Sequence, residues 1–568
     1  MLTSSKVPKN LKTTKLFKMS DKRLAAASEE NLFRIFTIPE APDSTLARIE
    51  QEVSQNLDGF LRDNIVAVEK PLSEIEQDFQ DSVVPEHPQF VSALADELLD
   101  KLVAQSVHTS SPSFIGHMTS ALPYFLLPLS KLMVGLNQNL VKIETSKAFT
   151  PLERQVIGML HRIAYGGTRT EAHNDQYYKS VMHSADTSLG AFCSGGTVAN
   201  ISALWIARNT LLGPNGSFKG VSKEGLFRAM SHYGYSRLVV LVSERGHYSL
   251  GKAADVLGLG RQDIVSVKTD ENNKICIESL EQRITELKAE NAGILSLVGV
   301  AGTTETGNID PLDKMADIAE REGIHFHVDA AWGGATMMSN NQRPLLKGIE
   351  RADSITVDAH KQMYVPMGAG MVLFKDAHST DVIEHHAEYI LRKGSKDLGS
   401  HTLEGSRPGM SMLVYACLKV MGRSGYEMLI DRSIDTAKYF ADLINAEDDF
   451  ELVSEPELCL LTYRYVPKVV KDYMETCDAE EKHIINELLN DLTRFIQKKQ
   501  RESGRSFVSR TRLTPKAHDG QTITVFRCVL ANPLTTKDIL KDILAEQKEI
   551  AKESWRSLPA ILKKIASL

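Results

Sequence analysis

A chain of 568 residues is too long for one hydrophobic core, and a net charge of -7 argues against nucleic acid or an anionic membrane as its main partner. Hydrophobic residues make up 42% and charged residues 24%, as in ordinary soluble globular proteins. No apolar run reaches the roughly 18 residues that a membrane span requires. The cysteines are scattered without a metal-ligand spacing, so we expect no bound metal, no disulfide framework and a cytoplasmic location.

The first part of the chain is predicted to be a tail followed by helices. Residues 1–30 are rich in lysine and nearly free of acids, and we expect a disordered tail there. The sequence leaves open whether translation begins at Met1 or at Met19. Residues 31–105 are predicted to form a helical N-terminal segment, because apolar residues recur at three- and four-residue steps over 46–57 and 90–102.

Short apolar strands alternate with helices in the middle of the chain. The predicted strands cover 238–242, 294–300, 325–328, 354–357 and 370–374. Strand–helix alternation favours an α/β fold with a mainly parallel, doubly wound sheet, and we assign it to a large domain over 106–385. Residues 386–568 mix strands with long helices, which predicts a smaller C-terminal α+β domain.

Small residues precede a predicted helix at Ser194-Gly195-Gly196-Thr197. Open backbone N–H groups and the helix dipole suit a phosphate at such a point. The alternative is a plain helix start, and this motif alone does not decide between the two.

Two further segments follow predicted strands. His247 comes just after the strand 238–242 and could stack on an aromatic ring, although in isolation a solvated loop histidine is the simpler interpretation. The loop Gly302–Asn308 carries three threonines between glycines. Their hydroxyls could face a ring or a phosphate, or they could bond only to the backbone of the turn.

A carboxylate and a lysine complete the pattern. Asp329 follows the strand 325–328, and the pair His360–Lys361 follows the strand 354–357. The carboxyl ends of parallel strands meet at one edge of a sheet, where ligands collect. An amine that can form a Schiff base, beside a carboxylate that can pair with a ring nitrogen, is the arrangement that pyridoxal 5′-phosphate needs.

Together these segments resemble the group II pyridoxal-phosphate-dependent amino acid decarboxylases, and within that family the bacterial aspartate 1-decarboxylases. The resemblance implies fold type I, a Schiff base on Lys361, a ring-nitrogen partner in Asp329 and a stacking ring in His247, which are the expected catalytic residues. The implied cofactor-binding residues are Gly195, Gly196, Thr197, His247, Thr304, Asp329, His360 and Lys361.

The resemblance also implies the substrate and the assembly. It predicts decarboxylation of an acidic L-amino acid, first of all L-aspartate to β-alanine for pantothenate and coenzyme A synthesis. The alternative is glutamate to γ-aminobutyrate. A homodimer with a shared active site is implied, without nucleic acid or membrane as a partner. The implied substrate-binding residues are His117, Thr119, Asn137, Asn139 and Arg527, whose guanidinium suits a carboxylate.

One departure from the family concerns the proton that the substrate carbon receives after CO2 leaves. Family members often use a tyrosine on a mobile loop, and the matching stretch 391–404 has none. His401, Lys396 and the nearby Tyr389 are open candidates. Arg407 is expected to be structural.

Rival interpretations share part of the pattern. Another type of pyridoxal enzyme would have Lys361 and Asp329 but not the whole set of motifs. A non-catalytic nucleotide-binding or scaffold module would bind no chromophore. His325 and His327 lack a third ligand, and we expect them to be packed, hydrogen-bonded residues rather than metal ligands.

Overall fold

The protein is described by a computed structural model that covers residues 45–62, 66–166, 174–387, 391 and 394–553. The predicted tail, the choice between Met1 and Met19, and the helical prediction for 31–44 lie outside the described residues. The predicted domain boundaries stay predictions, and the elements are given below as the structure has them.

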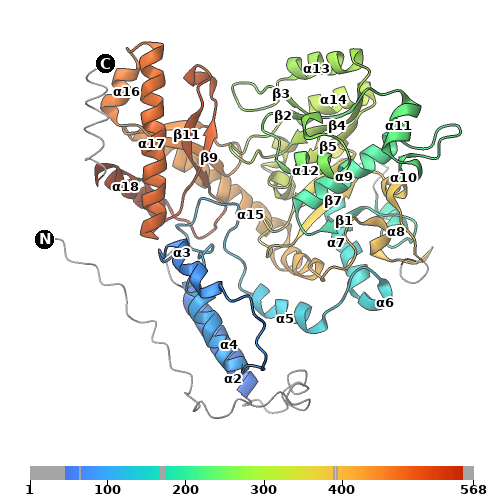
Figure 1. Ribbon diagram of the computed structural model, residues 1–568, viewed down its shortest axis with the longest axis horizontal. Coiled ribbons are helices and arrows are strands. Elements are labelled where there is room, and N and C mark those ends of the chain that lie inside the picture. Colours follow the sequence, from blue (N-terminus) through green and yellow to red (C-terminus); the bar gives the residue numbers. More distant parts are fainter. Residues whose placement is uncertain (1–44, 63–65, 167–173, 388–390, 392–393, 554–568) are drawn as a thin grey trace.

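A seven-stranded sheet forms the centre of the larger part of the molecule (Figure 1). Its strand order is β1-β7-β6-β5-β4-β2-β3, and β7 is the strand that runs antiparallel to its neighbours. The mainly parallel sheet predicted from the sequence is confirmed. The strands are β1 (Gly190–Cys193), β2 (Leu238–Ser243), β3 (Ile264–Val267), β4 (Gly293–Val300), β5 (His325–Asp329), β6 (Ser354–Asp358) and β7 (Gly370–Phe374).

Helices cover both faces of this sheet. Strand β2 shows why, because Val239 and Leu241 pack in one core cluster while Val240 and Val242 pack in another. Side chains alternate between the faces of a strand, so both faces are apolar and both need a cover. Helices α9 and α12 contribute to one cluster, and α7, α13 and α14 to the other. The helices around the sheet are α7 (Phe149–Tyr165), α8 (Asp175–Val181), α9 (Gly196–Leu211), α10 (Val221–Glu224), α11 (Leu226–Tyr233), α12 (Ser249–Val256), α13 (Ile277–Ala289) and α14 (Leu312–Glu322).

A smaller four-stranded antiparallel sheet follows in the sequence, with strand order β10-β11-β9-β8. The long helix α15 (Ser411–Ala446) leads to it from the large sheet (Figure 1). Helix α15 is interrupted at Gly422, whose φ of 62° and ψ of 177° are not helical. The remaining elements are β8 (Phe450–Ser454), β9 (Leu460–Tyr465), β10 (Ser509–Leu513), β11 (Ile523–Val529), α16 (Lys468–Met474), α17 (Ala479–Ser503) and α18 (Lys537–Glu553).

The helices α2 (Thr45–Arg62) and α4 (Val91–Leu98) lie apart from both sheets, at the bottom of Figure 1. Helix α4 and the turn after it leave apolar side chains exposed in the single chain: Leu94, Leu98 and Leu102 are 44%, 42% and 50% accessible. No helix among the described residues has the length and apolar character to cross a membrane. The elements are α2 (Thr45–Arg62), α3 (Leu72–Ile75), α4 (Val91–Leu98) with a π-helical turn Leu99–Val103, α5 (Leu126–Leu136) and α6 (Ile143–Ser146).

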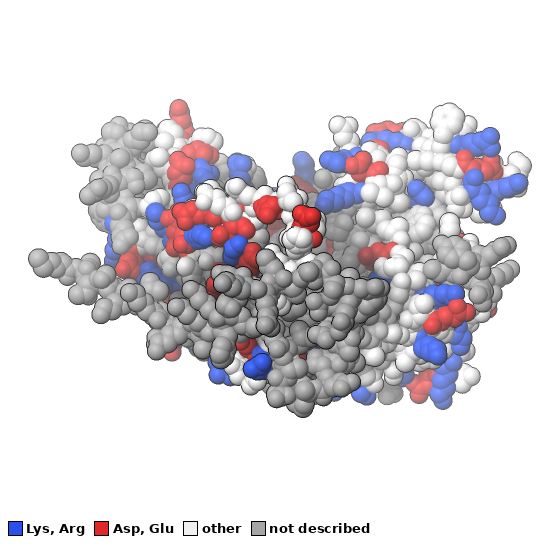
Figure 2. Space-filling view, turned by 60° about the horizontal axis from the view of Figure 1, so that its bottom comes forward, with Lys and Arg blue, Asp and Glu red and all other residues white. Residues whose placement is uncertain are grey.

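Lysine and arginine residues are interspersed with aspartate and glutamate on the face shown in Figure 2. Mixing of both signs is typical of a general solvent-exposed surface rather than of a nucleic-acid footprint. Both signs of charge are mixed in this way among the described residues of that face.

Candidate active site

The carboxyl ends of β5 and β6 bring the predicted lysine and carboxylate together. Asp329 ends β5 and is paired in register with Thr356 of the neighbouring strand β6. Lys361 follows β6 directly, and its Nζ lies 3.1 Å from the Asp358 carboxylate. Asp358 is buried, and its other carboxylate oxygen has no hydrogen-bond partner among the described residues. The edge of the sheet therefore carries an amine and two carboxylates within one small region.

The N-terminus of α9 packs against the same edge. A Cβ atom added to Gly196 would come within 2.8 Å of Asp358 Oδ2, so glycine is needed for this close approach. The N–H groups of Val198 and Ala199 already bond to the Gly195 carbonyl. The N–H groups before them lie in the first turn, where no intrahelical acceptor exists. They form a suitable place for an anion.

Two further side chains border this loop. The ring of His360 lies 3.6 Å from the position of a Cβ on Gly195, and its Nδ1 donates to the Ala369 carbonyl at 3.2 Å. Burial lowers the pKa of His360. The Ser194 N–H donates to Glu404 Oε2 at 2.9 Å, a contact that the sequence did not predict.

His247 follows β2 and is held by Ser249, whose Oγ lies 2.8 Å from its Nδ1. Burial is the largest cause that lowers the pKa of His247, and the charges of Asp329 and Lys361 also act on it. The imidazole is thus neutral at neutral pH and lies within electrostatic reach of Lys361. Its role at a cofactor ring stays a prediction.

The threonine loop after β4 makes two kinds of hydrogen bond, one within the loop and one to a distant arginine. The hydroxyls of Thr303 and Thr306 are buried and lie 2.8 Å apart, which matches the alternative of a self-bonded turn. The Thr304 carbonyl instead accepts a hydrogen bond of 2.6 Å from Arg527 Nε. The loop therefore anchors an arginine that comes from β11 of the small sheet.

Arg527, from β11, reaches the segment that carries two of the predicted substrate residues. This side chain is buried, and its Nη1 donates to the Gly116 carbonyl at 3.3 Å, so it reaches the segment that carries His117 and Thr119. Nδ1 of His117 lies 3.1 Å from Thr119 Oγ1. Burial lowers the pKa of His117 first, and the positive charges of Arg527 and Lys361 lower it further. His117 therefore lies close enough to Arg527 and to Lys361 for both positive charges to act on its ring.

Comparison with known proteins decides the family. The pyridoxal-dependent decarboxylase conserved domain matches residues 71–466. An aspartate 1-decarboxylase of Aliivibrio fischeri is 65% identical over 543 residues, which cover 96% of this chain and 98% of that protein. The chain belongs to the pyridoxal-dependent decarboxylase family. An acidic amino acid decarboxylase of Bos taurus is 30% identical over 66% of this chain and 67% of its own length.

Solved structures support the fold of this decarboxylase. Mouse CSAD matches with a TM-score of 0.77 at 24% identity, over 90% of this chain and 99% of that chain. A decarboxylase domain from Vibrio parahaemolyticus matches with a TM-score of 0.73 at 21% identity, over 93% and 100%. These similarities and the sheet topology confirm the predicted fold type I. The predicted carboxy-lyase class follows from the family.

Pyridoxal 5′-phosphate is the cofactor of the family, and the residues at the sheet edge fit it. Lys361 would supply an amine for its aldehyde, and Asp329 would supply a carboxylate for its ring nitrogen. The glycine-lined start of α9 leaves room and N–H donors for its phosphate. When bound, the cofactor withdraws electrons from the substrate's Cα. The protein's own residues bind and orient both molecules.

Two predicted substrate residues lie elsewhere in the single chain. Asn137 ends α5 in the left-handed conformation with φ 43°, and its side chain is exposed. Asn139 Nδ2 donates to Ser406 Oγ at 2.9 Å. The structure of one chain therefore connects Asn139 with the segment before α15 and leaves Asn137 exposed, and the role of both at the substrate stays a prediction.

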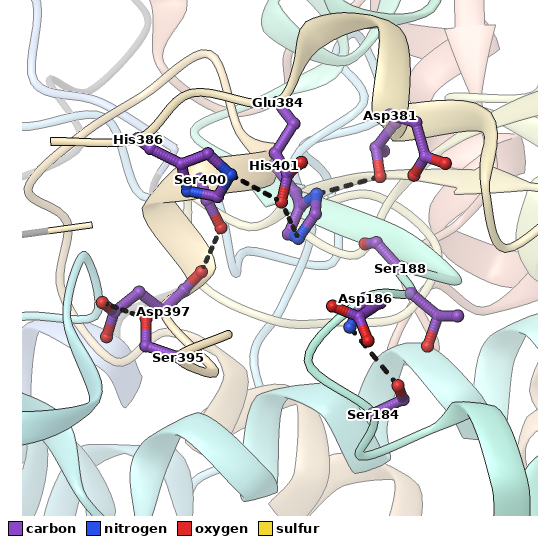
Figure 3. A network of polar contacts seen from close by, with 12 residues as sticks. Ser184, Asp186, Ser188, Asp381, Glu384, His386, Ser395, Asp397, Ser400 and His401 are labelled. Carbon is purple, nitrogen blue, oxygen red and sulfur yellow. Dashed lines mark hydrogen bonds and ion pairs between the residues drawn. The ribbon is translucent and has the colours of Figure 1, made fainter. Parts of the chain in front are cut away.

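His401, a candidate proton donor, is buried and belongs to a separate network of polar contacts beside the outer strand β1 (Figure 3). Its Nδ1 lies 3.0 Å from Thr380 Oγ1, and its Nε2 lies 4.0 Å from Glu384. Burial lowers its pKa. Lys396 is exposed, and Tyr389 lies outside the described residues.

Three residues expected to be structural are confirmed in that role. Arg407 forms a bidentate ion pair with Glu153, and both side chains are buried. His325 and His327 both bond to Ser354 Oγ, at 2.9 Å and 2.8 Å. Within the described part of the chain, no cluster of histidine, cysteine and acidic residues has the geometry to hold a metal ion.

Proposed function

We propose that this protein decarboxylates an acidic L-amino acid, and that L-aspartate, converted to β-alanine and CO2, is its substrate. The observation that carries this proposal is the 65% identity to an aspartate 1-decarboxylase over almost the whole of both chains. The aligned region includes the small sheet that supplies Arg527. It therefore includes the proposed substrate-binding residues as well as the proposed cofactor-binding residues.

The proposed roles follow from the chemistry of the residues. Lys361 forms the Schiff base with the cofactor, Asp329 keeps the ring nitrogen protonated, and His247 stacks on the ring. The phosphate is bound by backbone N–H groups at the start of α9 and by the neighbouring imidazole. The proposed cofactor-binding residues are Gly195, Gly196, Thr197, His247, Thr304, Asp329, His360 and Lys361.

Arg527 is the proposed partner of a substrate carboxylate. A carboxylate that leaves water must gain a charged, hydrogen-bonded partner, or binding is lost. The anchoring of its Nε on the Thr304 carbonyl holds the guanidinium at the sheet edge near Lys361. His117 and Thr119 lie next to it and offer hydrogen bonds to the other end of a short acidic substrate. A bulky aromatic substrate would find no comparable partner there.

The substrate is tested by side-by-side assays of amine formation with L-aspartate, L-glutamate, cysteine sulfinate and an aromatic amino acid. We expect β-alanine from aspartate at the highest kcat/KM. Glutamate is the alternative, since relatives at lower identity include acidic amino acid decarboxylases. γ-Aminobutyrate formation without β-alanine formation would replace aspartate by glutamate in the proposal.

The cofactor role is tested with Lys361→Ala. The purified wild-type protein should show the visible absorption band of a lysine Schiff base, which borohydride reduction removes. The variant should lack that band and should lose decarboxylation. Absence of the band in a wild-type protein supplied with pyridoxal phosphate would refute the assignment of Lys361. It would favour a non-catalytic module instead.

We further propose a homodimer with a shared active site, located in the cytoplasm. The exposed apolar side chains of α4 and of the turn after it support this proposal. Large apolar patches on a lone chain mark interfaces, and a second copy of the chain would bury these side chains. The six cysteines are all free, and four of them are buried, which suits a reducing compartment.

A further inference from the structure

The amide of Asn200 lies at the centre of a buried hydrogen-bond network behind the candidate active site. The residue is 1% exposed and sits on α9, one turn after the start of the helix. Its Nδ2 donates to Asp329 Oδ2 at 2.9 Å and to Ser249 Oγ at 3.0 Å. Its Oδ1 accepts from Thr356 Oγ1 at 2.7 Å and from His327 Nε2 at 3.1 Å. All four hydrogen-bonding positions of one side chain are therefore used.

These partners allow a single orientation of the amide. Asp329 as a carboxylate can only accept, so the nitrogen of Asn200 must face it. Burial lowers the pKa of His327 to about 4, so this imidazole is neutral at neutral pH. Its Nε2 can then carry the ring proton that the Asn200 oxygen accepts. A flipped amide would place its oxygen against the carboxylate and would lose the bonds to Thr356 and His327.

The same amide orients the Ser249 hydroxyl toward His247, whose tautomer the Ser249 backbone determines. The backbone N–H of Ser249 points at His247 Nδ1 over 3.3 Å, and a backbone N–H can only donate. Nδ1 is therefore an acceptor, and a neutral His247 carries its proton on Nε2. The Ser249 hydroxyl accepts from Asn200, so its own proton is free for Nδ1, 2.8 Å away.

We infer that Asn200 is a positioning residue for the cofactor. Its Nδ2 orients the Asp329 carboxylate for the ring nitrogen and also orients the Ser249 hydroxyl, so that the hydroxyl proton is directed at Nδ1 of His247. A donor that bonds to the charged form of a carboxylate favours that form. This inference rests on the proposed roles of Asp329 and His247 and is independent of the identity of the substrate.

The test is Asn200→Ala in enzyme reconstituted with pyridoxal phosphate that is ¹⁵N-labelled at the ring nitrogen. The ¹⁵N resonance distinguishes a protonated from an unprotonated ring nitrogen without any turnover. We expect the resonance to move toward the unprotonated position. The dissociation constant of the cofactor should rise about tenfold or more, since a hydrogen bond to a charged group is lost.

Three variants serve as controls. Ser249→Ala should leave the ring-nitrogen resonance unchanged, because it interrupts only the branch to His247. It should alter the pH profile of kcat. Ser202→Ala, on the same helix, removes a bond to the Val198 carbonyl and should change neither readout. Asp329→Asn should abolish ring protonation; if it does not, the proposed role of Asp329 fails rather than that of Asn200.

A wild-type resonance and a wild-type cofactor affinity in Asn200→Ala would overturn the inference. Should that variant fail to fold, Thr356→Val takes its place, because it removes a hydroxyl that orients the Asn200 oxygen and keeps the side-chain shape. A smaller shift of the resonance in the same direction supports the inference. An unchanged resonance in Thr356→Val overturns it.

Discussion

At the scale of single residues, the site depends on side chains that burial keeps neutral beside others that stay charged. His117, His247, His327 and His360 all have pKa values lowered mainly by burial. Arg527 stays cationic in spite of burial, because guanidinium has a very high intrinsic pKa. Arg527 therefore supplies a fixed positive charge beside neutral imidazoles, which suits a substrate carboxylate.

His327 makes the stability of the fold dependent on pH. Its pKa is about 4 in the folded protein and about 6.5 in an unfolded chain, so the unfolded state binds more protons between these values. Stability is complete above about pH 6.5 and is lost as the pH falls toward 4. At pH 5 the loss should be on the order of 2 kcal/mol relative to pH 7.

Urea unfolding followed by tryptophan fluorescence at the two pH values measures this loss. His327→Gln removes the titration and should reduce the difference between pH 7 and pH 5 by about the same amount. An equal pH dependence in the variant and the wild type would show that other groups cause it.

At the scale of elements, α9 is the helix that joins the parts of the site. Its start provides the anion-binding loop, and its second turn carries Asn200 to the end of β5. The helical repeat places Asn200 four residues after Gly196, on the same side of the helix. That periodicity was the available signal for Asn200. It could not have identified the partners, since Asn200 and Asp329 are 129 positions apart.

The interruption of α15 gives a second prediction at this scale. Gly422 has a backbone conformation that only glycine adopts readily, and an added Cβ would meet no atom within 4 Å. Gly422→Ala should therefore destabilise the protein by about 1–3 kcal/mol through backbone strain alone, with kcat per folded molecule unchanged.

Thermal unfolding of Gly422→Ala and of Gly425→Ala tests this expectation. Gly425 lies in the same helix without a positive φ, and an added Cβ would lie 3.3 Å from Met421 Cβ, so alanine there carries no backbone strain and should destabilise less than alanine at Gly422. Equal effects of the two substitutions would contradict a conformational role for Gly422.

At the scale of the whole molecule, the exposed apolar stripe of Leu94, Leu98 and Leu102 predicts association. The combined substitution Leu94→Glu and Leu98→Glu would place charges in the proposed interface. Sedimentation velocity should then show a shift from dimer to monomer, together with a loss of decarboxylase activity, because the shared site is incomplete. Phe227→Glu, on α11, changes an isolated side chain that is 88% exposed and should leave the dimer intact. A fully active wild-type monomer would contradict the proposed assembly.

Several elements of the fold could be predicted because their residues repeat with a clear period. The buried strands β2, β4 and β7 are mainly apolar runs, and polar and apolar residues alternate in β5 and β6; the structure confirms each of these strands. The strands β1 and β3 were missed because four residues are too few to show a period. Strand β10 was missed because its exposed positions alternate with partly buried ones and include Arg510 and Arg512.

The sequence by itself determined the family and the order of the chemical groups. Each of them stands directly after a strand or before a helix, and parallel strands bring such positions to one edge. Only the tertiary structure decided which of these groups touch. It brought Arg527 from the small sheet to the Thr304 carbonyl, grouped His401 with Thr380, and made Asn200 the link between Asp329 and Ser249. The physical reason is that hydrogen bonds between distant segments depend on packing, which leaves no period in the sequence.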